Sequence, residues 1–354
     1  MNREWKSFLQ DQGARFKDEA VQGFAEPARE MDAVAKTTVL VDLSDQALIR
    51  VHGADAQGFL NGQFSNDVRR VDERHSQLAA WCTAKGRALA VLRVFRRGED
   101  YYLQLPAGLQ ETVLTRLRTF VLRAKVILEP ADAELVSLGL AGARAESLLQ
   151  ETLGNAPADL EGCVTHAEVT VMRLPGPAPR FLLIAPPATA RAQWQRLRAH
   201  ATPVGPPAWA WLDIAAGIPR VYPQTSEAFV PQMLNLEILG AVDFKKGCYP
   251  GQEIVARTHY LGRLTQRMVR AHADAEAQPG MPIYAPELPG QATGSVVDAA
   301  LSPDGGYDVL AVVRTRSAAA GRLHLGTETG PTLSLLPLPY SLPPEKESGE
   351  TAGT

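Results

Sequence analysis

The chain has 354 residues, of which 45% are hydrophobic and 21% are charged, and its formal net charge at pH 7 is −3. This ordinary globular composition excludes wholesale disorder, a fibrous repeat and a uniformly basic chain. The 3 cysteines are too few for a disulfide framework and indicate a reducing compartment. At roughly 150 residues per domain, the length predicts two or three domains.

The N-terminal segment mixes acidic and basic side chains and has no apolar core, so it does not resemble a secretory signal. The sequence has no run of about 18 apolar residues that could cross a membrane. We therefore expect a cytoplasmic protein with no membrane partner. Trp5, Phe8, Leu9 and Phe16 recur at roughly helical spacing and predict an N-terminal helix within residues 1–30.

Residues 35–132 have the pattern of an α+β unit. The predicted elements are, in order, a strand at 47–51, a short helix beginning at Asp55, strands at 78–83, 87–95 and 101–105, a helix with apolar positions from 113 to 121, and a strand at 125–128. Asp55 suits the first turn of a helix, because a carboxylate there complements the helix dipole. The three central strands are separated only by short turns and therefore predict a meander.

A second α+β unit is expected over residues 133–265. Its predicted strands are 135–140, 169–174 and 181–185, and its predicted helices are 144–153 and 188–200. Two α+β layers with antiparallel sheets fit this order better than a doubly wound parallel sheet. Beyond it, short strands within residues 266–340 predict a small β-barrel. The polar residues 341–354 predict a disordered tail.

The segment with the most distinctive chemistry is residues 244–253, where one thiol lies behind two lysines. The ammonium groups of Lys245 and Lys246 would favour the thiolate and so lower the pKa of Cys248. The flanking glycines let the backbone approach a ligand or adopt a positive φ. The residues alone also fit a tight turn around a small buried cysteine, which is the commoner role of a lone cysteine. The candidate loop residues are Lys245, Lys246, Gly247, Cys248, Tyr249, Gly251, Gln252 and Glu253.

The other cysteines and the paired tryptophans have simpler interpretations. Cys82 falls in a predicted strand and is expected in the core, whereas Cys163 is expected in a loop without a role. Trp209 and Trp211 are expected in the core, or along a ligand groove. No Cys-x-x-Cys or His-x-x-His pair occurs in the sequence, so no metal site is predicted.

The octapeptide K-G-C-Y-P-G-Q-E at residues 246–253 resembles the signature of YgfZ-type folate-binding proteins, which are relatives of the glycine-cleavage T-protein. Further blocks that resemble this family follow in the family's order at residues 51–68, 81–87, 216–219, 229–236 and 256–263. The resemblance covers roughly residues 40–313. It implies two ferredoxin-like antiparallel α+β layers and a C-terminal β-barrel in a ring-like, three-domain arrangement.

The resemblance also implies a function. Members of the family bind tetrahydrofolate or a derivative and support the assembly or repair of iron–sulfur enzymes, including enzymes that thiolate tRNA. Iron–sulfur proteins would then be clients, and Cys248 is the candidate catalytic residue. The expected folate contacts are Asn66, Asp213, Tyr249, Gln252, Glu253 and Arg257.

Two departures from the related T-protein pattern bear on this implied function. An acidic pair that serves aminomethyl transfer in T-proteins is replaced here by Leu89 and Ala90. Neither side chain can move a proton or stabilise a developing charge, so a folate-dependent one-carbon transferase is the disfavoured alternative. Relatives often place a Glu at the position of Ala215, where it can bond the pterin, and Asp213 lies two residues earlier.

The near-neutral net charge conceals two basic stretches. Residues 85–97 contain five basic residues and no acidic one, and residues 245–270 contain six basic residues against one Glu. If the two stretches share a face, they would attract an anion such as a polyglutamyl folate tail or an RNA backbone. A solvated face without a ligand is the alternative. A tRNA contact is therefore a hypothesis, without support from a known RNA-binding motif.

Overall fold

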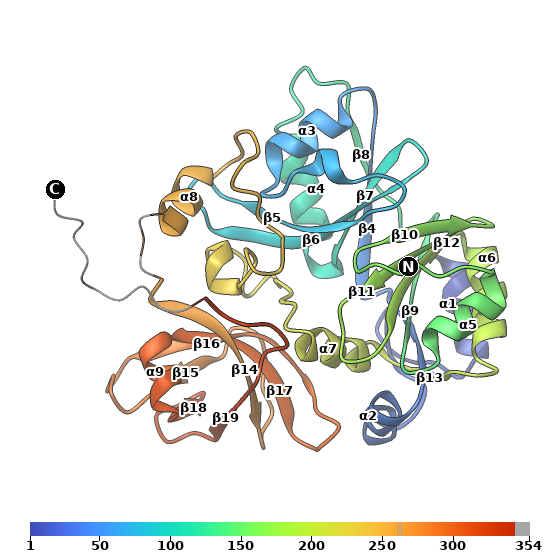
Figure 1. Cartoon of the computed structure of the whole chain (residues 1–354). Coiled ribbons are helices and arrows are strands. Elements are labelled where there is room, and N and C mark those ends of the chain that lie inside the picture. The colour runs from blue at the N-terminus through green and yellow to red at the C-terminus, as the bar shows by residue number, and fades with distance from the viewer. Residues whose placement is uncertain (261, 263, 344–354) are drawn as a thin grey trace.

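The computed structural model of the chain describes residues 1–260, 262 and 264–343, which form two sheets with their helices and one closed barrel. Figure 1 shows these three parts arranged around a common centre. Helix α7 (Pro206–Ala215) lies near that centre, between the second sheet and the barrel. The expected fold class, two α+β layers and a C-terminal barrel, is confirmed.

The first sheet has five strands in the order β5-β6-β7-β4-β8. They are β4 (Gln46–His52), β5 (Gln77–Cys82), β6 (Ala88–Arg97), β7 (Asp100–Pro106) and β8 (Ile127–Pro130), with helices α3 (Ala56–Gln63) and α4 (Gln110–Arg118) and the short turns η1 (Val68–Arg70) and η2 (Ala107–Leu109). The expected meander is β5-β6-β7, paired antiparallel throughout. The first eight residues of β6 are all buried and nearly all apolar, so this strand lacks the alternation of apolar and polar residues found where one face of a sheet is solvated.

The second sheet has six strands in the order β10-β11-β12-β9-β3-β13. They are β3 (Val39–Asp42), β9 (Val136–Ala141), β10 (Cys163–His166), β11 (Val169–Leu174), β12 (Arg180–Ala185) and β13 (Thr202–Val204), with helices α5 (Ala145–Leu153) and α6 (Pro187–Leu197). Strand β3 precedes the first sheet in the chain but pairs with β9 and, in parallel, with β13. The sheets therefore do not follow a single division of the chain near residue 133. Cys163 begins β10 and is buried, which corrects its expected place in a loop.

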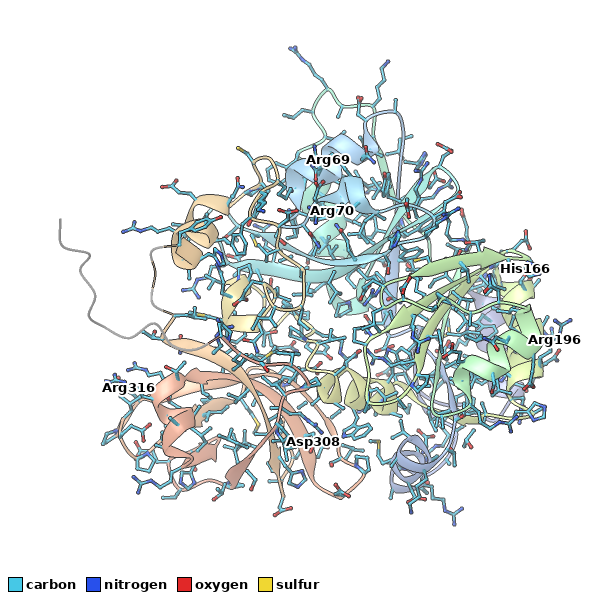
Figure 2. The ribbon with its side chains drawn as sticks, in the orientation of Figure 1. Arg69, Arg70, His166, Arg196, Asp308 and Arg316 are labelled. Atoms are coloured by element: carbon cyan, nitrogen blue, oxygen red, sulfur yellow. The ribbon has the colours of Figure 1, made fainter. Side chains whose placement is uncertain are left out.

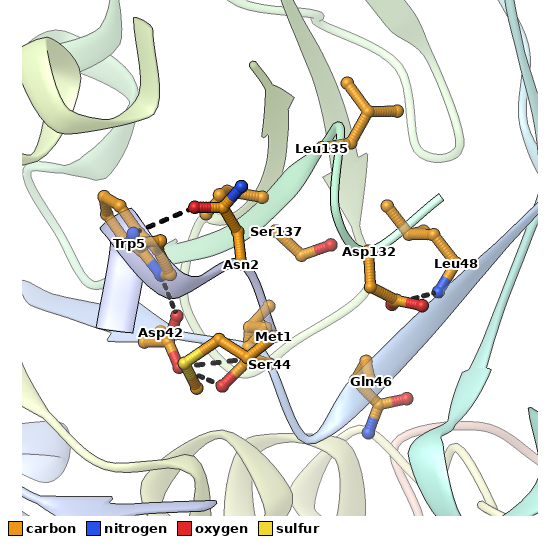
Figure 3. Close-up of a pocket in the computed structure, with 12 residues that line it drawn as sticks. Met1, Asn2, Trp5, Asp42, Ser44, Gln46, Leu48, Asp132, Leu135 and Ser137 are labelled. Carbon is orange, nitrogen blue, oxygen red and sulfur yellow. Dashed lines mark hydrogen bonds between the residues drawn. The ribbon is translucent and has the colours of Figure 1, made fainter. Parts of the chain in front are cut away.

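The N-terminal helix is shorter than the expected span of residues 1–30. Helix α1 (Arg3–Asp11) ends before Gly13, whose φ of +91° a helix cannot continue. The chain then forms the hairpin of β1 (Arg15–Lys17) and β2 (Ala20–Gly23), followed by α2 (Pro27–Lys36). The indole of Trp5 donates to Asp42 Oδ1 at 2.7 Å, as Figure 3 shows, and so fastens α1 to the end of β3.

The expected barrel after residue 266 is present and closes in the order β14-β17-β16-β15-β18-β19. Its strands are β14 (Gln266–Ala273), β15 (Pro282–Tyr284), β16 (Ala292–Leu301), β17 (Tyr307–Arg314), β18 (Leu323–Leu325) and β19 (Thr332–Leu336), with one helix, α9 (Thr315–Ala320). Of the expected tail, residues 344–354 lie outside the described residues. Within the described ranges, no helix is long and apolar enough to span a bilayer.

A buried ionic cluster lies where the three parts meet. Arg220 donates to Asp298 of β16 at 2.9 Å, and its guanidinium lies 3.6 Å from Asp45, just before β4. Asp213 of α7 accepts a 2.7 Å hydrogen bond from Arg180 of β12 and lies 3.8 Å from Arg220. Burial raises the pKa of Asp45 to about 6, although Arg220 opposes this shift. Removing one partner of such a cluster typically costs about 3–5 kcal/mol, because a buried charge is left unpaired.

Candidate functional site

The loop that contains Cys248 joins the turn η3 (Pro231–Leu234) and its following segment to helix α8 (Gln252–Tyr260). All three cysteines are free thiols, and Cys248 alone among them is exposed. Burial raises the pKa of Cys82 to about 12 and that of Cys163 to about 11, so neither forms a thiolate near neutral pH. The expected core position of Cys82 is confirmed, and the chemistry of the three thiols is concentrated at Cys248.

The loop docks on the β5–β6 turn through two glycines. A Cβ atom on Gly251 would lie 2.4 Å from the carbonyl oxygen of Thr83 and 2.6 Å from Gly86 Cα. A Cβ atom on Gly86 would in turn lie 3.0 Å from Cβ of Ile254 on α8. Both glycines have positive φ values, +80° for Gly251 and +69° for Gly86. Only glycine therefore fits this backbone-to-backbone contact at Gly251 without a shift.

Lys246 is oriented differently from the expectation of a lysine pair beside the thiol. Its side chain is buried, and Nζ donates to the carbonyl oxygens of Asn61 and Phe64 at the C-terminal end of α3. A cation is favourable there, because the last carbonyls of a helix carry partial negative charge. Nζ also lies 4.9 Å from the ring centroid of Tyr249, and burial lowers the pKa of Lys246 to about 8. Lys246 is therefore an anchor of the loop, whereas Lys245 is exposed.

The residues after Cys248 divide between anchoring and exposed positions. Tyr249 is buried, which raises the pKa of its hydroxyl. Gln252 begins α8 and its amide lies 3.4 Å from the carbonyl oxygen of Lys246. Glu253 and Arg257 lie on α8 with exposed side chains. Cys248 is thus an exposed residue between two anchors, Lys246 and Tyr249.

Asn66, expected to contact folate, is buried below the loop. Its side-chain amide donates to the carbonyl oxygens of Leu78 at 2.8 Å and Gly240 at 2.7 Å, and its Oδ1 accepts from the amide of Asp67. Asn66 therefore ties the segment before the loop to β5. Its role as a folate ligand stays a prediction, and all three of its hydrogen bonds here go to the backbone.

Asp213 lies elsewhere, on the wall of a cavity of about 60 Å³ between the two sheets and α7. The cavity is lined by Gln46, Leu78, Val91, Leu92, Arg93, Gln104, Leu105, Pro106, Leu174, Trp209, Asp213, Ile218, Pro219 and Arg220. Arg180, whose guanidinium lies 4.8 Å from the Trp209 ring centroid, is buried with Nε and Nη2 unpartnered among the described residues. The expected folate contacts therefore fall in two places, and Asp213 alone of them lines this cavity.

No local pattern in the sequence points to the arginines around this cavity. Arg180 looked like the start of an apolar strand, and Arg220 followed the Ala-Gly block without an acidic neighbour in the sequence. Their partners are distant in the chain, so only the fold brings them together. At the two positions where T-proteins have acids, Leu89 and Ala90 are buried within β6, and Ala215 is the buried last residue of α7. Among the described residues, no cluster of His, Cys, Asp and Glu could hold a metal ion.

The glycine contact predicts that Gly251→Ala destabilises the docked loop. The positive φ costs an alanine about 1–2 kcal/mol, and the clash with Thr83 adds to it. Thermal unfolding and the rate of proteolysis within the loop would show the loss. Gly247→Ala is the matched control, because no heavy atom lies within 4 Å of a Cβ there. Equal stability of the two variants would contradict the contact.

The buried position of Lys246 predicts a pH dependence of stability. Its pKa is about 8 in the folded chain against an ordinary 10.5, so between these values the unfolded chain holds a proton that the folded chain has released. The contribution of Lys246 to the free energy of unfolding therefore rises with pH over this window and is constant below it. In urea titrations, the destabilisation caused by Lys246→Met should grow between pH 8 and 10, by up to roughly 1 kcal/mol per pH unit. A difference for Lys246→Met that stays constant over this pH range would contradict the shift.

Comparison with known proteins agrees with these features. Residues 8–239 match the family model of the GCVT N-terminal domain. The chain is similar to two relatives named tRNA-modifying protein YgfZ from Escherichia coli, with 33% identity to that of strain SE11 and 34% to that of strain UMN026. Each match extends over 327 residues and covers 89% of this chain and 98% of the relative.

The fold is similar to that of a solved structure, the glycine cleavage system aminomethyltransferase T from Bartonella henselae. The TM-score is 0.76 at 18% identity, and the match covers 94% of this chain and 96% of that one. This likeness shows a shared fold. Because the family model matches more than half of the chain and the relatives are matched over nearly their whole length, the chain belongs to the YgfZ family, within the proteins that carry the GCVT domain.

Proposed function

We propose that this protein binds tetrahydrofolate or a derivative and supports the assembly or repair of iron–sulfur enzymes, including those that thiolate tRNA. Cys248 is the residue that acts in this proposal, and iron–sulfur proteins are its clients. The relatives named as tRNA-modifying proteins support the link to tRNA. We also propose a cytoplasmic location, because three free thiols suit a reducing compartment.

The observation that carries the proposal is the exposure of Cys248 on an anchored loop. A cysteine that serves only packing is typically buried, as Cys82 and Cys163 are here. The chain holds the loop on both sides of Cys248, through Lys246 and Gly251, and leaves the thiol in solvent. A thiolate in this position can bind iron or carry sulfur between proteins, because it is a soft ligand and a nucleophile.

The cavity that Asp213 lines is the candidate folate site. Its apolar walls and Trp209 suit an aromatic heterocycle, and the unpartnered N–H groups of Arg180 and Gln104 beside it suit a ligand with hydrogen-bond acceptors. Its volume of about 60 Å³ is well below the roughly 300–1,000 Å³ of typical ligand pockets. The proposal therefore requires lining side chains to move when a folate binds.

The alternative function, aminomethyl or one-carbon transfer of the T-protein type, lacks its chemistry here. Leu89 and Ala90 are buried apolar residues of β6. No carboxylate is available at these positions to act as a base or to stabilise positive charge on a reacting amine. The protein thus combines the T-protein fold with a different reactive group.

The thiol is tested by Cys248→Ser in cells that lack the native gene. We expect normal folding but loss of rescue, with iron–sulfur enzyme activities and tRNA thiolation falling to the level of the empty vector. Cys163→Ser is the matched control, because it removes another free thiol and a hydroxyl can also donate to the carbonyl oxygen of Glu161, which Sγ approaches to 3.7 Å. Full rescue by Cys248→Ser would reduce the thiol to a structural role.

Folate binding is tested by titrating tetrahydrofolate into the protein and following heat release and tryptophan fluorescence. Because Trp209 lines the cavity, we expect the fluorescence change to be much smaller in Trp209→Phe, while heat release persists. The control is Trp194, a buried tryptophan of α6, and the Trp194→Phe variant should retain the wild-type fluorescence change. Absence of heat at millimolar ligand would refute folate binding, and an unchanged signal in Trp209→Phe would place the ligand elsewhere.

A further inference from the structure

The outer surface around α8 is formed by residues from three separate segments. We call it the α8 face and define it by Lys85 of the β5–β6 turn, Phe244 and Lys245 before Cys248, and Ile254, Arg257, His259 and Tyr260 of α8. Ile254 contacts Gly86, and Phe244 stacks on His259, so the three segments touch one another. Cys248 follows Lys245 by three positions and is exposed as well.

The two basic stretches of the sequence meet at this face, and several arginines toward their far ends are paired with carboxylates. At the far end of the first stretch, Arg93 pairs with Glu161 and Arg96 with Glu99. At the far end of the second stretch, the pairs are Arg267–Glu237 and Arg270–Asp308. These pairs neutralise four arginines that lie away from the α8 face, and Arg97 there donates to the backbone carbonyl oxygen of Glu168.

The near ends carry exposed charge. Lys85 and Lys245 are exposed and form no ion pair within the described part of the chain. Arg257 is exposed on α8. Of the acidic residues close by, Asp243 is already paired with Arg70 at 2.8 Å, while Glu253 is exposed at the start of α8. The α8 face is therefore locally positive on a chain whose formal net charge is −3.

Aromatic rings accompany this charge. The rings of Phe244 and His259 stack at 3.8 Å between centroids, and the Tyr260 ring meets His259 edge-on at 4.8 Å. The side chains of His259 and Tyr260 are exposed, Tyr260 to 58%. Exposed rings offer flat faces on which a planar group can stack, and a purely electrostatic anion site has no use for them.

We propose that the α8 face binds a single-stranded segment of RNA beside Cys248, with phosphates at Lys85, Lys245 and Arg257 and an unpaired base on His259 or Tyr260. Cationic side chains interleaved with exposed aromatic rings are how proteins bind unpaired nucleic acid. A polyglutamyl tail would use the charge but has no base to stack on the rings. This inference concerns the partner of the site in the proposed function, yet it requires neither folate binding nor the thiol.

The test is fluorescence anisotropy with a labelled single-stranded 20-nucleotide RNA of mixed sequence, compared with the same RNA as a duplex. We expect the single strand to bind more tightly, and Lys85→Glu/Lys245→Glu to weaken binding at least 10-fold. That double variant should also reduce the slope of log Kd against log salt by about 1.4, which corresponds to two phosphate contacts. Tyr260→Ala or His259→Ala should weaken binding about 5- to 150-fold, the loss of one stacked base, while Tyr260→Phe should keep it.

Matched controls come from exposed arginines on other parts of the surface. Arg196 of α6 and Arg316 of α9 lie at two edges of the molecule away from α8 (Figure 2). Arg196→Glu/Arg316→Glu makes the same change in net charge and should leave RNA affinity within about twofold of the parent. Cys248→Ser should bind RNA normally, so failure of the thiol or folate proposal is distinguishable from failure of this one.

Three results would overturn the proposal. The first is no binding of the single strand up to 100 µM protein at about 50 mM salt. The second is an equal loss of affinity in the control double variant. That result would show that the attraction for RNA depends on the net charge of the protein and not on the α8 face. The third is duplex binding as tight as single-strand binding together with an unchanged Kd for both Tyr260→Ala and His259→Ala, which would remove the stacking site.

Discussion

The contact between Gly251 and the β5–β6 turn determines how this protein presents its thiol. Two backbone segments approach until a Cβ would lie 2.4 Å from a carbonyl oxygen, so neither a side chain nor a water molecule fits between them. This approach fixes the start of α8 against the first sheet, and Lys246 fixes the other side of the loop against α3. The loop is short and fastened on both sides, and Cys248 between the two attachments is exposed. The chain thus holds an exposed thiol on an anchored segment.

A second constraint acts at the centre of the molecule. The three parts meet at Arg220, which is buried and faces Asp298 of the barrel, Asp213 of α7 and Asp45 before β4. Hydrophobic residues of similar volume could stabilise such a junction at least as well, because desolvating charges is expensive. A charged junction nevertheless favours one relative placement of the three parts, since a shifted arrangement would leave charges unpaired. The N–H groups of Arg180 beside it, which have no partner among the residues that the structure describes, give the centre a capacity for hydrogen bonds that packing alone does not need.

The sequence was sufficient for features that depend on local patterns. The β5-β6-β7 meander, the barrel strands and the segment around Cys248 follow from alternation, turn residues and an unusual octapeptide. The sequence was insufficient for features that depend on contacts between residues far apart in the chain. Strand β3 is three apolar residues followed by Asp42, and its partners, β9 and β13, are determined by the fold. Lys246 is two residues before the thiol in sequence, yet its amine donates to the carbonyl oxygens of Asn61 and Phe64, because a buried ammonium needs hydrogen-bond acceptors and the end of α3 supplies them.

Contacts between distant parts of the chain also bear on how a folate could influence the thiol. Cys248 does not line the cavity that contains Asp213, so a ligand confined there would not touch it. The two places are joined by backbone: the segment after Arg220 hydrogen-bonds with Ala88 through the amide and carbonyl groups of residues 227 and 229, and Ala88 leads directly into the turn on which Gly251 rests. A ligand that moved Arg220 or the wall formed by β6 would therefore be connected to the support of the loop through these backbone hydrogen bonds. In such an arrangement folate would adjust the presentation of Cys248 to a partner, and its own one-carbon chemistry would be unnecessary, which agrees with the replacement of the T-protein acids by Leu89 and Ala90.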